Sequence, residues 1–341
     1  MRKCAIFEEY VAGKSLEDVK EQLGLEKVVK LASNENPYGP SPRVFEVLRN
    51  FSDLHRYPNP EYRALREKLS EYTGWEMQRI VVGAGIDGIL ETIFKILIDE
   101  GDEVLIPIPT FQYYAILAKL HCAKVVTVKR DENFMISEEV FEKISSRTKL
   151  IVVPSPNNPT GNAEDPKVVE EIVNSTNAIV FVDEAYVEFA DSKLEMDSDN
   201  LIVARTMSKA FALANLRVGY ARLPRWLLRY YRAASTPFPI STLAEKCAVS
   251  ALEDLDWMTS CVEKIRRERG RVYGELKKIV QVYPSQANFL FFRSRKGLTE
   301  ELLRRGVIIR DCRSFGIEGY RVTIGKPEEN EFFLEKLKEV L

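Results

Sequence analysis

Histidine and cysteine are scarce in this chain of 341 residues, and their scarcity argues against several kinds of active site. The histidines are His55 and His121, so a histidine-based metal centre or a Ser-His-Asp relay has little material to work with. The five cysteines are scattered, odd in number and never spaced C-x-x-C. This pattern argues against a zinc site or a disulfide framework and favours reduced thiols in a cytoplasm.

Long apolar runs and a strong net charge are also missing. No run reaches the ~18 apolar residues that a membrane span needs, and the opening MRKCAIFEEY has no secretory apolar segment. A net charge of −2 gives no reason to expect nucleic acid or an anionic membrane as a partner. With 45% apolar and 29% charged residues, the composition fits a soluble globular enzyme rather than a disordered chain.

Short β-branched runs alternate with amphipathic helical runs through the middle of the chain. We expect strands over 79–83, 103–109, 124–129, 149–156, 178–185 and 200–206. Because these runs are apolar on both faces and separated by helices, they predict an α/β fold whose mainly parallel central sheet is covered by helices.

The sequence after about residue 240 has a different character, because long charged helices precede a few short strands. We therefore expect a large domain over 31–238 and a smaller α+β C-terminal domain over 239–341. Residues 1–30 are expected to form a helical arm that packs with the small domain or a partner subunit.

Polar and aromatic residues follow several of the expected strands. They are Gly85 to Asp87, Phe111, Asn158, Asp183, Tyr186 and Thr206 to Lys209. Ligands of parallel sheets gather at the carboxyl ends of the strands, so these residues predict a site at one sheet edge. Taken singly, each has a simpler interpretation: Asn158 as a turn residue before proline, Asp183 as a helix cap, Phe111 as core.

Two glycine motifs in the chain are misleading. GAGIDG (83–88) matches the dinucleotide fingerprint, but the strand that follows ends without the required acid. It therefore predicts a phosphate at a helix N-terminus better than a nicotinamide cofactor. AGKS (12–15) resembles the end of a P-loop, yet Glu8 stands where that loop needs glycine, which disfavours an ATPase.

Lys209 lies in the apolar stretch RTMSKAFALANLRVGYA and is a surface lysine, an ion-pair member or a reactive amine. With a strand-end aspartate and a phosphate cradle nearby, a reactive lysine suits pyridoxal phosphate, which needs a Schiff-base lysine and an acidic partner for its ring nitrogen.

Six segments carry a resemblance to a known family. SPNNPTG (155–161), VDEAY (182–186) and TMSKAFALANLRVGY (206–220) resemble signature segments of fold-type I aminotransferases. LASNENPYGPSP (31–42), RYPNP (56–60) and YRVTIG (320–325) narrow the resemblance to the histidinol-phosphate aminotransferases, from about residue 10 to the C-terminus. The resemblance implies transfer of an amino group between glutamate and imidazole-acetol phosphate, in a ping-pong mechanism.

The resemblance also implies residue roles. Lys209 would bind pyridoxal phosphate covalently and carry the proton, and Asp183 would keep the pyridine nitrogen protonated. The remaining cofactor contacts would come from Tyr186, Asn158, Phe111, Thr206, Ser208, Arg217 and the amides of Gly85, Ile86 and Asp87, with Tyr57 reaching in from the neighbouring subunit of a homodimer. No metal is expected.

Substrate selection would fall to four further residues. Arg321 matches the arginine that pairs with the anionic end of the substrate, and glutamate would reuse it. Arg310 and Tyr10 match positions that grip the substrate phosphate, and Asn34 would also contact substrate. The alternatives are an aromatic or broad-specificity aminotransferase, a related decarboxylase, an NAD-dependent oxidoreductase, or a non-enzymatic binding module.

One departure from the family pattern concerns the phosphate turn. Family members usually have Ser or Ala followed by Asp-Glu, whereas this chain reads Ile86-Asp87-Gly88. Ile86 supplies no hydroxyl, so we expect the turn to offer backbone donors alone and the side chains of Arg217, Thr206 and Ser208 to matter more.

Overall fold

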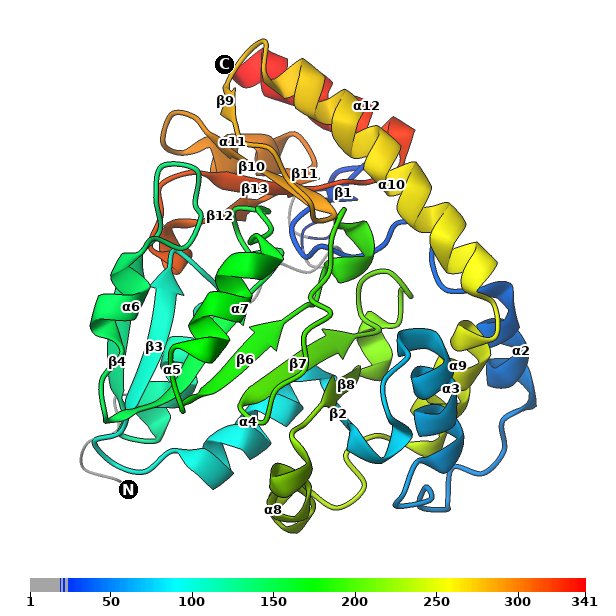
Figure 1. Ribbon diagram of the computed structural model, residues 1–341. Coiled ribbons are helices and arrows are strands. Elements are labelled where there is room, and N and C mark those ends of the chain that lie inside the picture. The colour runs from blue at the N-terminus through cyan, green and yellow to red at the C-terminus, as the bar shows by residue number, and fades with distance from the viewer. Residues whose placement is uncertain (1–18, 20, 22–23) are drawn as a thin grey trace.

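The computed structural model describes residue 19, residue 21 and residues 24–341 (Figure 1). Tyr10, the AGKS segment and most of the expected N-terminal arm lie outside the described residues. In the described part of the chain, no helix is both long enough and apolar enough to cross a membrane.

A seven-stranded sheet forms the centre of the molecule. Its order is β2 (Ile80–Ala84), β8 (Val218–Arg222), β7 (Leu201–Thr206), β6 (Ile179–Asp183), β5 (Thr148–Pro154), β3 (Glu103–Ile108) and β4 (Lys124–Lys129). The five strands from β7 to β4 pair in parallel, whereas β8 runs antiparallel to both β7 and β2. The predicted α/β fold with a mainly parallel sheet is therefore confirmed.

Both faces of this sheet are buried along its inner strands, which explains the continuous apolar runs of β5, β6 and β7, whereas the edge strand β4 is largely exposed. Along β6, Ile179 and Phe181 belong to one buried cluster, and Val180 and Val182 belong to the other. The first cluster is covered by α4 (Gly85–Leu97), α5 (Tyr113–Leu120) and α8 (Leu228–Ala234). The second includes side chains of α3 (Arg63–Thr73), α7 (Pro166–Asn174) and α9 (Thr242–Leu252).

A second, four-stranded sheet lies above the first in Figure 1. Its antiparallel order is β12 (Arg310–Asp311), β13 (Tyr320–Thr323), β10 (Phe289–Arg293) and β9 (Gln281–Val282). The helices α10 (Leu255–Leu276), α11 (Leu298–Arg304) and α12 (Pro327–Val340) belong to this part of the chain. Further helices are α2 (Pro42–Asn50) and α6 (Glu139–Lys143).

The segment after the undescribed N-terminus joins this upper part. β1 (Val29–Lys30) pairs in parallel with β11 (Val307–Ile308), and the carbonyl of Leu31 accepts a 2.8 Å hydrogen bond from the amide of Thr323. The N-terminal segment is thus joined both to β11 and to β13 of the four-stranded sheet. The predicted domain limits of 1–30, 31–238 and 239–341 stay a prediction.

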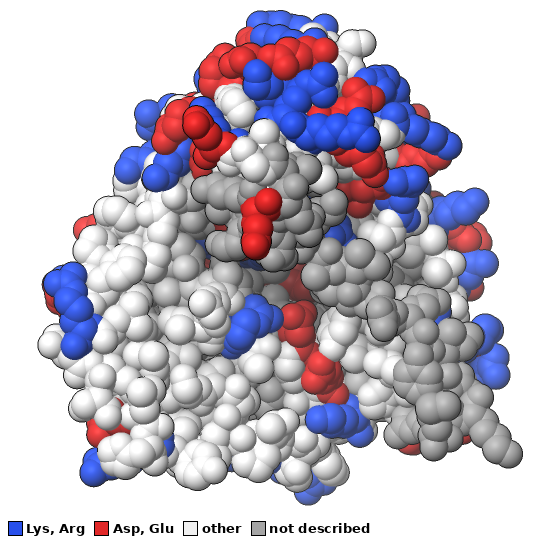
Figure 2. All heavy atoms as spheres, turned by 180° about the vertical axis from the view of Figure 1, so that it is seen from behind, with Lys and Arg blue, Asp and Glu red and all other residues white. Residues whose placement is uncertain are grey.

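The surface of the upper part is rich in charge of both signs. Figure 2 shows interleaved Lys or Arg and Asp or Glu side chains there, above a lower region with fewer charges. Ion pairs such as Arg271–Glu331 at 3.0 Å and Arg305–Glu339 at 3.5 Å contribute to this pattern. Exposed pairs of this kind each contribute about 0–1 kcal/mol to the free energy of unfolding.

The cysteines only partly match the prediction. Cys247, Cys261 and Cys312 are buried free thiols. Cys122 is disulfide-bonded, so the prediction of reduced thiols is wrong at this position.

Candidate active site

A cavity of about 240 Å³ lies where the strands β5, β6 and β7 end, beneath the small sheet. Its walls include most of the residues that the sequence predicted for the site. They are Asn34, Ile86, Asp87, Phe111, Asn158, Asp183, Tyr186, Thr206, Ser208, Lys209, Arg217, Arg310 and Arg321. Residues from widely separated parts of the chain, from Asn34 to Arg321, therefore meet at one place.

One end of the cavity is built to hold an anion. The thirteen-residue helix α4 begins at Gly85, whose own amide donates to the carbonyl oxygen of Arg217 at 2.9 Å. The amides of Ile86 and Asp87 in the same first turn have no partner within the helix and carry partial positive charge. The Arg217 guanidinium lies beside this turn, 3.4 Å from Ser208 Oγ, and Thr206 Oγ1 donates to Ser208 Oγ at 2.9 Å. Amides, hydroxyls and a guanidinium together suit a phosphate group.

Glycine is required at this turn for lack of space. A Cβ atom on Gly85 would lie 2.7 Å from Arg217 Nη2, and Gly85 has a φ of +72°. A Cβ atom on Gly219 would lie 2.3 Å from the Gly85 carbonyl carbon, so β8 packs directly against the turn. The carboxylate of Asp87 accepts a hydrogen bond from Arg217 Nη2 at 3.0 Å and thereby neutralises part of the arginine charge. The backbone amide of Asp87 still belongs to the first turn of α4.

Asp183 is a buried carboxylate at the end of β6. Its Oδ1 accepts a 3.0 Å hydrogen bond from the amide of Ala185, and its Oδ2 accepts one of 2.7 Å from the hydroxyl of Tyr114. Burial raises the pKa of Asp183 to about 6, although the two hydrogen bonds act in the opposite direction. A cationic group entering the cavity would find this carboxylate ready to pair with it.

Tyr114 was not among the predicted site residues. It lies in the first turn of α5, three positions after Phe111 of the preceding loop, and the two rings meet edge to face with centroids 5.6 Å apart. Phe111 precedes the helix and Tyr114 lies in its first turn, so the contact depends on the bend at the start of α5, and no periodic pattern in the sequence signals it.

Lys209 is an amine held away from water. Its Nζ donates a 3.1 Å hydrogen bond to the carbonyl oxygen of Ser33. Burial lowers the pKa of Lys209 to about 8, and the nearby charges of Arg321 and Arg217 lower it further than the acids Glu35 and Asp87 can restore. A substantial neutral fraction near pH 7 makes this amine a nucleophile and a base.

Asn34 connects the N-terminal segment to the site. It is buried with a φ of +55°, and its Nδ2 donates to the hydroxyl of Tyr186 at 3.0 Å. Its amide donates to Thr323 Oγ1 at 2.9 Å, so it bridges the small sheet to the site. The phenol of Tyr186 is thereby held in place from the N-terminal side of the chain.

The two predicted substrate arginines lie side by side. Arg310 of β12 is directly opposite Arg321 of β13, and both are buried. Arg321 Nη1 donates to Asn158 Oδ1, and its Nη2 donates to the carbonyl oxygen of Ala32. Two guanidinium groups above a single cavity can bind two anionic groups of one substrate.

Among the described site residues, Gly85 and Tyr57 do not line the cavity. Gly85 lies in the turn next to Ile86, and Tyr57 lies on the surface. Its side chain is 82% exposed, and its ring stacks on Phe238 with centroids 4.7 Å apart.

The arrangement fits the phosphorylated pyridine cofactor that the resemblance implies. The helix N-terminus with Arg217 suits its phosphate, the buried Asp183 suits a protonated ring nitrogen, and Lys209 suits its aldehyde. Phe111 supplies a flat apolar wall between these two ends.

Comparison with known proteins agrees with this assignment. The family described as aminotransferase class I and II matches residues 26–337. Histidinol-phosphate aminotransferase 1 of Archaeoglobus fulgidus is 65% identical over 317 residues, which cover 92% of this chain and 99% of that protein. The histidinol-phosphate aminotransferase of Methanosarcina mazei is 43% identical, with 95% of this chain and 92% of that protein covered.

Solved structures share the fold. Histidinol-phosphate aminotransferase from Sinorhizobium meliloti, in complex with pyridoxal-5′-phosphate, superposes with a TM-score of 0.88 at 23% identity, and 96% of each chain is covered. Aspartate aminotransferase from Thermus thermophilus with maleate gives a TM-score of 0.84 at 23% identity, covering 96% of this chain and 94% of that one. The chain belongs to the aminotransferase class I and II family, and it is a pyridoxal-phosphate-dependent enzyme of the fold-type I architecture.

Proposed function

We propose that this enzyme is a histidinol-phosphate aminotransferase of histidine biosynthesis. It would exchange an amino group between L-glutamate and imidazole-acetol phosphate, giving L-histidinol phosphate and 2-oxoglutarate. The pairing of Arg310 with Arg321 above the cavity supports this most directly, because histidinol phosphate carries a phosphate and glutamate carries two carboxylates. The 65% identity to a protein of that name, over nearly all of both chains, supports it as well.

The cofactor would be held by residues from several strands. Ile86 and Asp87 would offer amides to the phosphate, together with the side chains of Thr206, Ser208 and Arg217. The expected contact from the Gly85 amide is wrong, because that amide donates to the carbonyl oxygen of Arg217. Tyr186 and Asn158 would hydrogen-bond the ring oxygen, and Phe111 would lie against the ring. Pyridoxal phosphate, when bound, supplies an electron sink that makes the Cα–H bond of an amino acid acidic.

The protein's own groups would then manage charge and protons. Asp183 would keep the proton on the ring nitrogen by pairing with it as a carboxylate. The hydroxyl of Tyr114 and the amide of Ala185 favour the charged form of this carboxylate by donating hydrogen bonds to it. Nζ of Lys209 would carry the proton between the substrate Cα and C4′ of the cofactor, which its lowered pKa allows. Arg321 would fix the carboxylate or other anionic end of the substrate in both half-reactions.

Other expected features remain part of the proposal. The exposed ring of Tyr57 is suited to contact a neighbouring subunit, in line with the predicted homodimer. Asn34 would act on the substrate and also position Tyr186. Tyr10, expected at the substrate phosphate, lies outside the described residues. A cytoplasmic location also stays a prediction.

The substrate is tested by comparing amino donors in a single half-reaction. We expect the pyridoxal form to react with histidinol phosphate at a kcat/KM at least about 10²-fold above that for phenylalanine or tyrosine. A donor without the phosphate forgoes charge-assisted hydrogen bonds to a buried arginine, which are worth roughly 3 kcal/mol. Stopped-flow absorbance measures all three rates. Comparable rates with all three donors would favour the aromatic or broad-specificity alternative.

Substitution of Arg310 by alanine should separate the two substrates. We expect KM for histidinol phosphate to rise about 10²-fold and KM for glutamate to change less than about threefold, since Arg321 serves both. Steady-state kinetics in both directions measures this. Arg313→Ala is the matched control, because Arg313 is exposed and paired with Asp311 at the surface. An equal rise in both KM values would refute a phosphate-binding role for Arg310.

Substitution of Tyr114 by phenylalanine should move a pH dependence. The hydrogen bond from the Tyr114 hydroxyl lowers the pKa of Asp183 in the unmodified enzyme. The variant lacks this bond, so the pKa of Asp183 should rise above about 6. The carboxylate form is lost as pH falls through the pKa, so affinity for pyridoxal phosphate should fall about one pH unit earlier in the variant. Fluorescence titration from pH 5 to 8 measures this. Tyr113→Phe, which removes a contact to Glu91 instead, should leave the profile unchanged.

A further inference from the structure

A row of three residues crosses the small sheet above the cavity. Phe291 of β10 lies directly opposite Arg321 of β13, and Arg321 lies opposite Arg310 of β12. Directly opposed residues of antiparallel strands point to the same face of the sheet. Phe291 therefore shares the cavity-facing side with both arginines, and we call these three residues the arginine row.

An aromatic residue from the large sheet's side packs against this row. Phe134 follows β4, and its ring meets that of Phe291 edge to face with centroids 5.6 Å apart. It also lies 4.8 Å from the ring of Tyr283. Phe134 belongs to a buried cluster with Cys312 and Phe315, and the Phe315 ring lies 5.3 Å from the Arg310 guanidinium. The cluster thus connects the turn after β4 with the substrate arginines.

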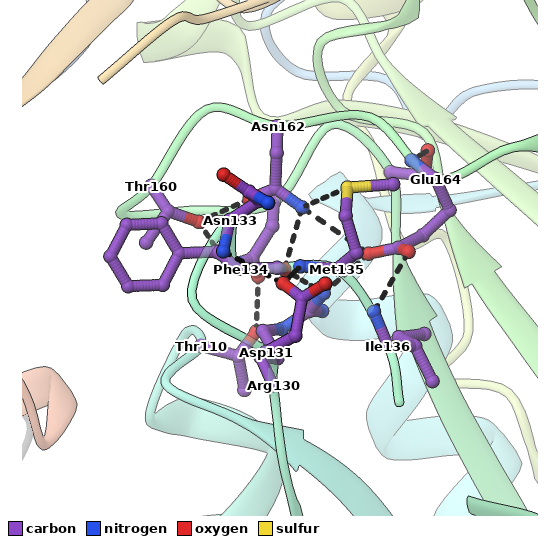
Figure 3. Close-up of polar contacts among 12 residues, drawn as sticks. Thr110, Arg130, Asp131, Asn133, Phe134, Met135, Ile136, Thr160, Asn162 and Glu164 are labelled. Atoms are coloured by element: carbon purple, nitrogen blue, oxygen red, sulfur yellow. Dashed lines mark hydrogen bonds and ion pairs between the residues drawn. The ribbon is translucent and has the colours of Figure 1, made fainter. Parts of the chain in front are cut away.

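The backbone of Phe134 is in an unusual conformation. Its φ is +65°, a region that costs a bulky residue about 1–3 kcal/mol. Its carbonyl oxygen accepts hydrogen bonds from Arg130 Nη1 at 2.9 Å and from Asn162 Nδ2 at 2.8 Å. Figure 3 shows these donors converging on the turn from the end of β4 and from the loop after β5.

An ion pair forms the base of this arrangement. Arg130 Nη1 contacts Glu164 Oε1, and the two side chains are 0% and 1% exposed. Glu164 Oε2 accepts from the amide of Ile136 at 3.0 Å, which fixes the far side of the same turn. Within the described residues, Nε and Nη2 of Arg130 lack a hydrogen-bond partner. A buried ion pair with unsatisfied donors adds little stability over apolar packing. We therefore expect the main effect of this pair to be that it fixes the position of the turn that carries Phe134.

The same base holds the loop that carries Asn158. The amide of Glu164 donates to Ser155 Oγ at 3.0 Å, and the amide of Asn157 donates to the carbonyl oxygen of Asn162 at 2.8 Å. Asn158 in turn accepts from Arg321. The arginine row is therefore held from two sides by one buried cluster, once through Asn158 and once through Phe134.

We propose that Phe134 is a positioning residue for anion binding by Arg310 and Arg321. Locked by Arg130, Glu164 and Asn162, its ring sets the distance of the arginine row from Lys209 and Asp183. Loss of the ring would change the position of the small sheet, and with it of Arg310 and Arg321, over the cavity. The cofactor phosphate site at the N-terminus of α4 would not change. The inference rests on the proposed function only in that these arginines bind an anionic substrate.

The test compares Phe134→Leu with Phe333→Leu in the pyridoxal-phosphate-loaded enzyme. Phe333 of α12 is fully buried and lies beside Phe292, whose side chain points to the opposite face of the same sheet from that of Phe291. Dissociation constants of 2-oxoglutarate and inorganic phosphate are measured by the change in visible absorbance. We expect both to rise about tenfold in Phe134→Leu and to change less than about twofold in Phe333→Leu. Affinity for pyridoxal phosphate should stay within about threefold in both.

Unchanged anion affinity in Phe134→Leu, or an equal loss in both variants, would overturn the proposal. If Phe134→Leu does not fold, Asn162→Ala provides the same test by removing one hydrogen bond that fixes the turn. The result is separate from that of the proposed function. Should the wild-type enzyme not react with histidinol phosphate, the function fails, yet the anion affinities still decide the role of Phe134.

Discussion

Replacing Lys209 by alanine is expected to lower kcat by about 10³- to 10⁴-fold, the largest effect of any single substitution in this enzyme. The variant loses its covalent link to pyridoxal phosphate and the one amine in the described part of the cavity that can move a proton from Cα. The cradle at α4 is unaffected, so the cofactor should still bind. Single-turnover absorbance measurements give the rate, and added methylamine should restore part of it.

The surface variant Lys264→Ala is the control, because Lys264 is exposed and lies over the ring of Tyr38. Its rate should equal that of the unmodified enzyme. A turnover in Lys209→Ala within tenfold of that rate would show that another group carries the proton. Borohydride reduction followed by mass spectrometry should place the cofactor label on Lys209.

Because the pKa of Lys209 is about 8, the rate at which Lys209 reacts with pyridoxal phosphate should depend on pH. About one tenth of Lys209 is neutral at pH 7, against less than about one thousandth of a lysine with an ordinary pKa. Capture of pyridoxal phosphate by the cofactor-free protein should therefore quicken with pH up to about 8 and then level off.

Asp183→Asn is expected to lower kcat by about 10³-fold, a loss of about 4 kcal/mol in transition-state stabilisation. A neutral amide cannot pair with a protonated ring nitrogen, so the ring would draw fewer electrons from the substrate. The fold should persist, since the amide oxygen still accepts from Ala185 and the hydroxyl of Tyr114 can rotate to accept from the amide nitrogen.

Asp165→Asn serves as the comparison for this substitution. Asp165 caps α7 by accepting from the amide of Lys167, and asparagine is an equally good cap. Thermal unfolding should show both variants within a few degrees of the unmodified enzyme, and only Asp183→Asn should lose turnover. Normal turnover in Asp183→Asn would rule out the carboxylate as the partner of the ring nitrogen.

Most strands of the central sheet can be predicted because they are short apolar runs, a pattern set by local sequence, whereas β8 (Val218–Arg222) is not among the expected strands. The sequence predicts a strand over 103–109, for example, and β3 spans Glu103–Ile108. Several site residues follow the same logic, since strand ends of a parallel sheet necessarily meet at one edge. Asp183 closes β6 and Lys209 comes three residues after β7, so the strand pattern alone places both at that edge.

Other parts of the site depend on contacts that no local pattern reveals. Tyr114 has the sequence context of an ordinary core residue of α5, and only the fold brings its hydroxyl to Asp183. The left-handed turns at Asn34 and Phe134 are stabilised by partners far along the chain. The closeness of Arg310 and Arg321 is implied by the family resemblance, but their direct opposition is set by strand register.

The pairing of the N-terminal segment with the small sheet has a consequence for synthesis on the ribosome. Asn34 and Thr323 lie 289 residues apart, so the early segment must wait for almost the whole chain before its partner emerges. Contacts of such long range form late in folding. Until then the carbonyl of Ser33 is not held where it accepts the hydrogen bond from Lys209. A nascent chain arrested before β13 should therefore contain a folded central sheet but no catalytic activity.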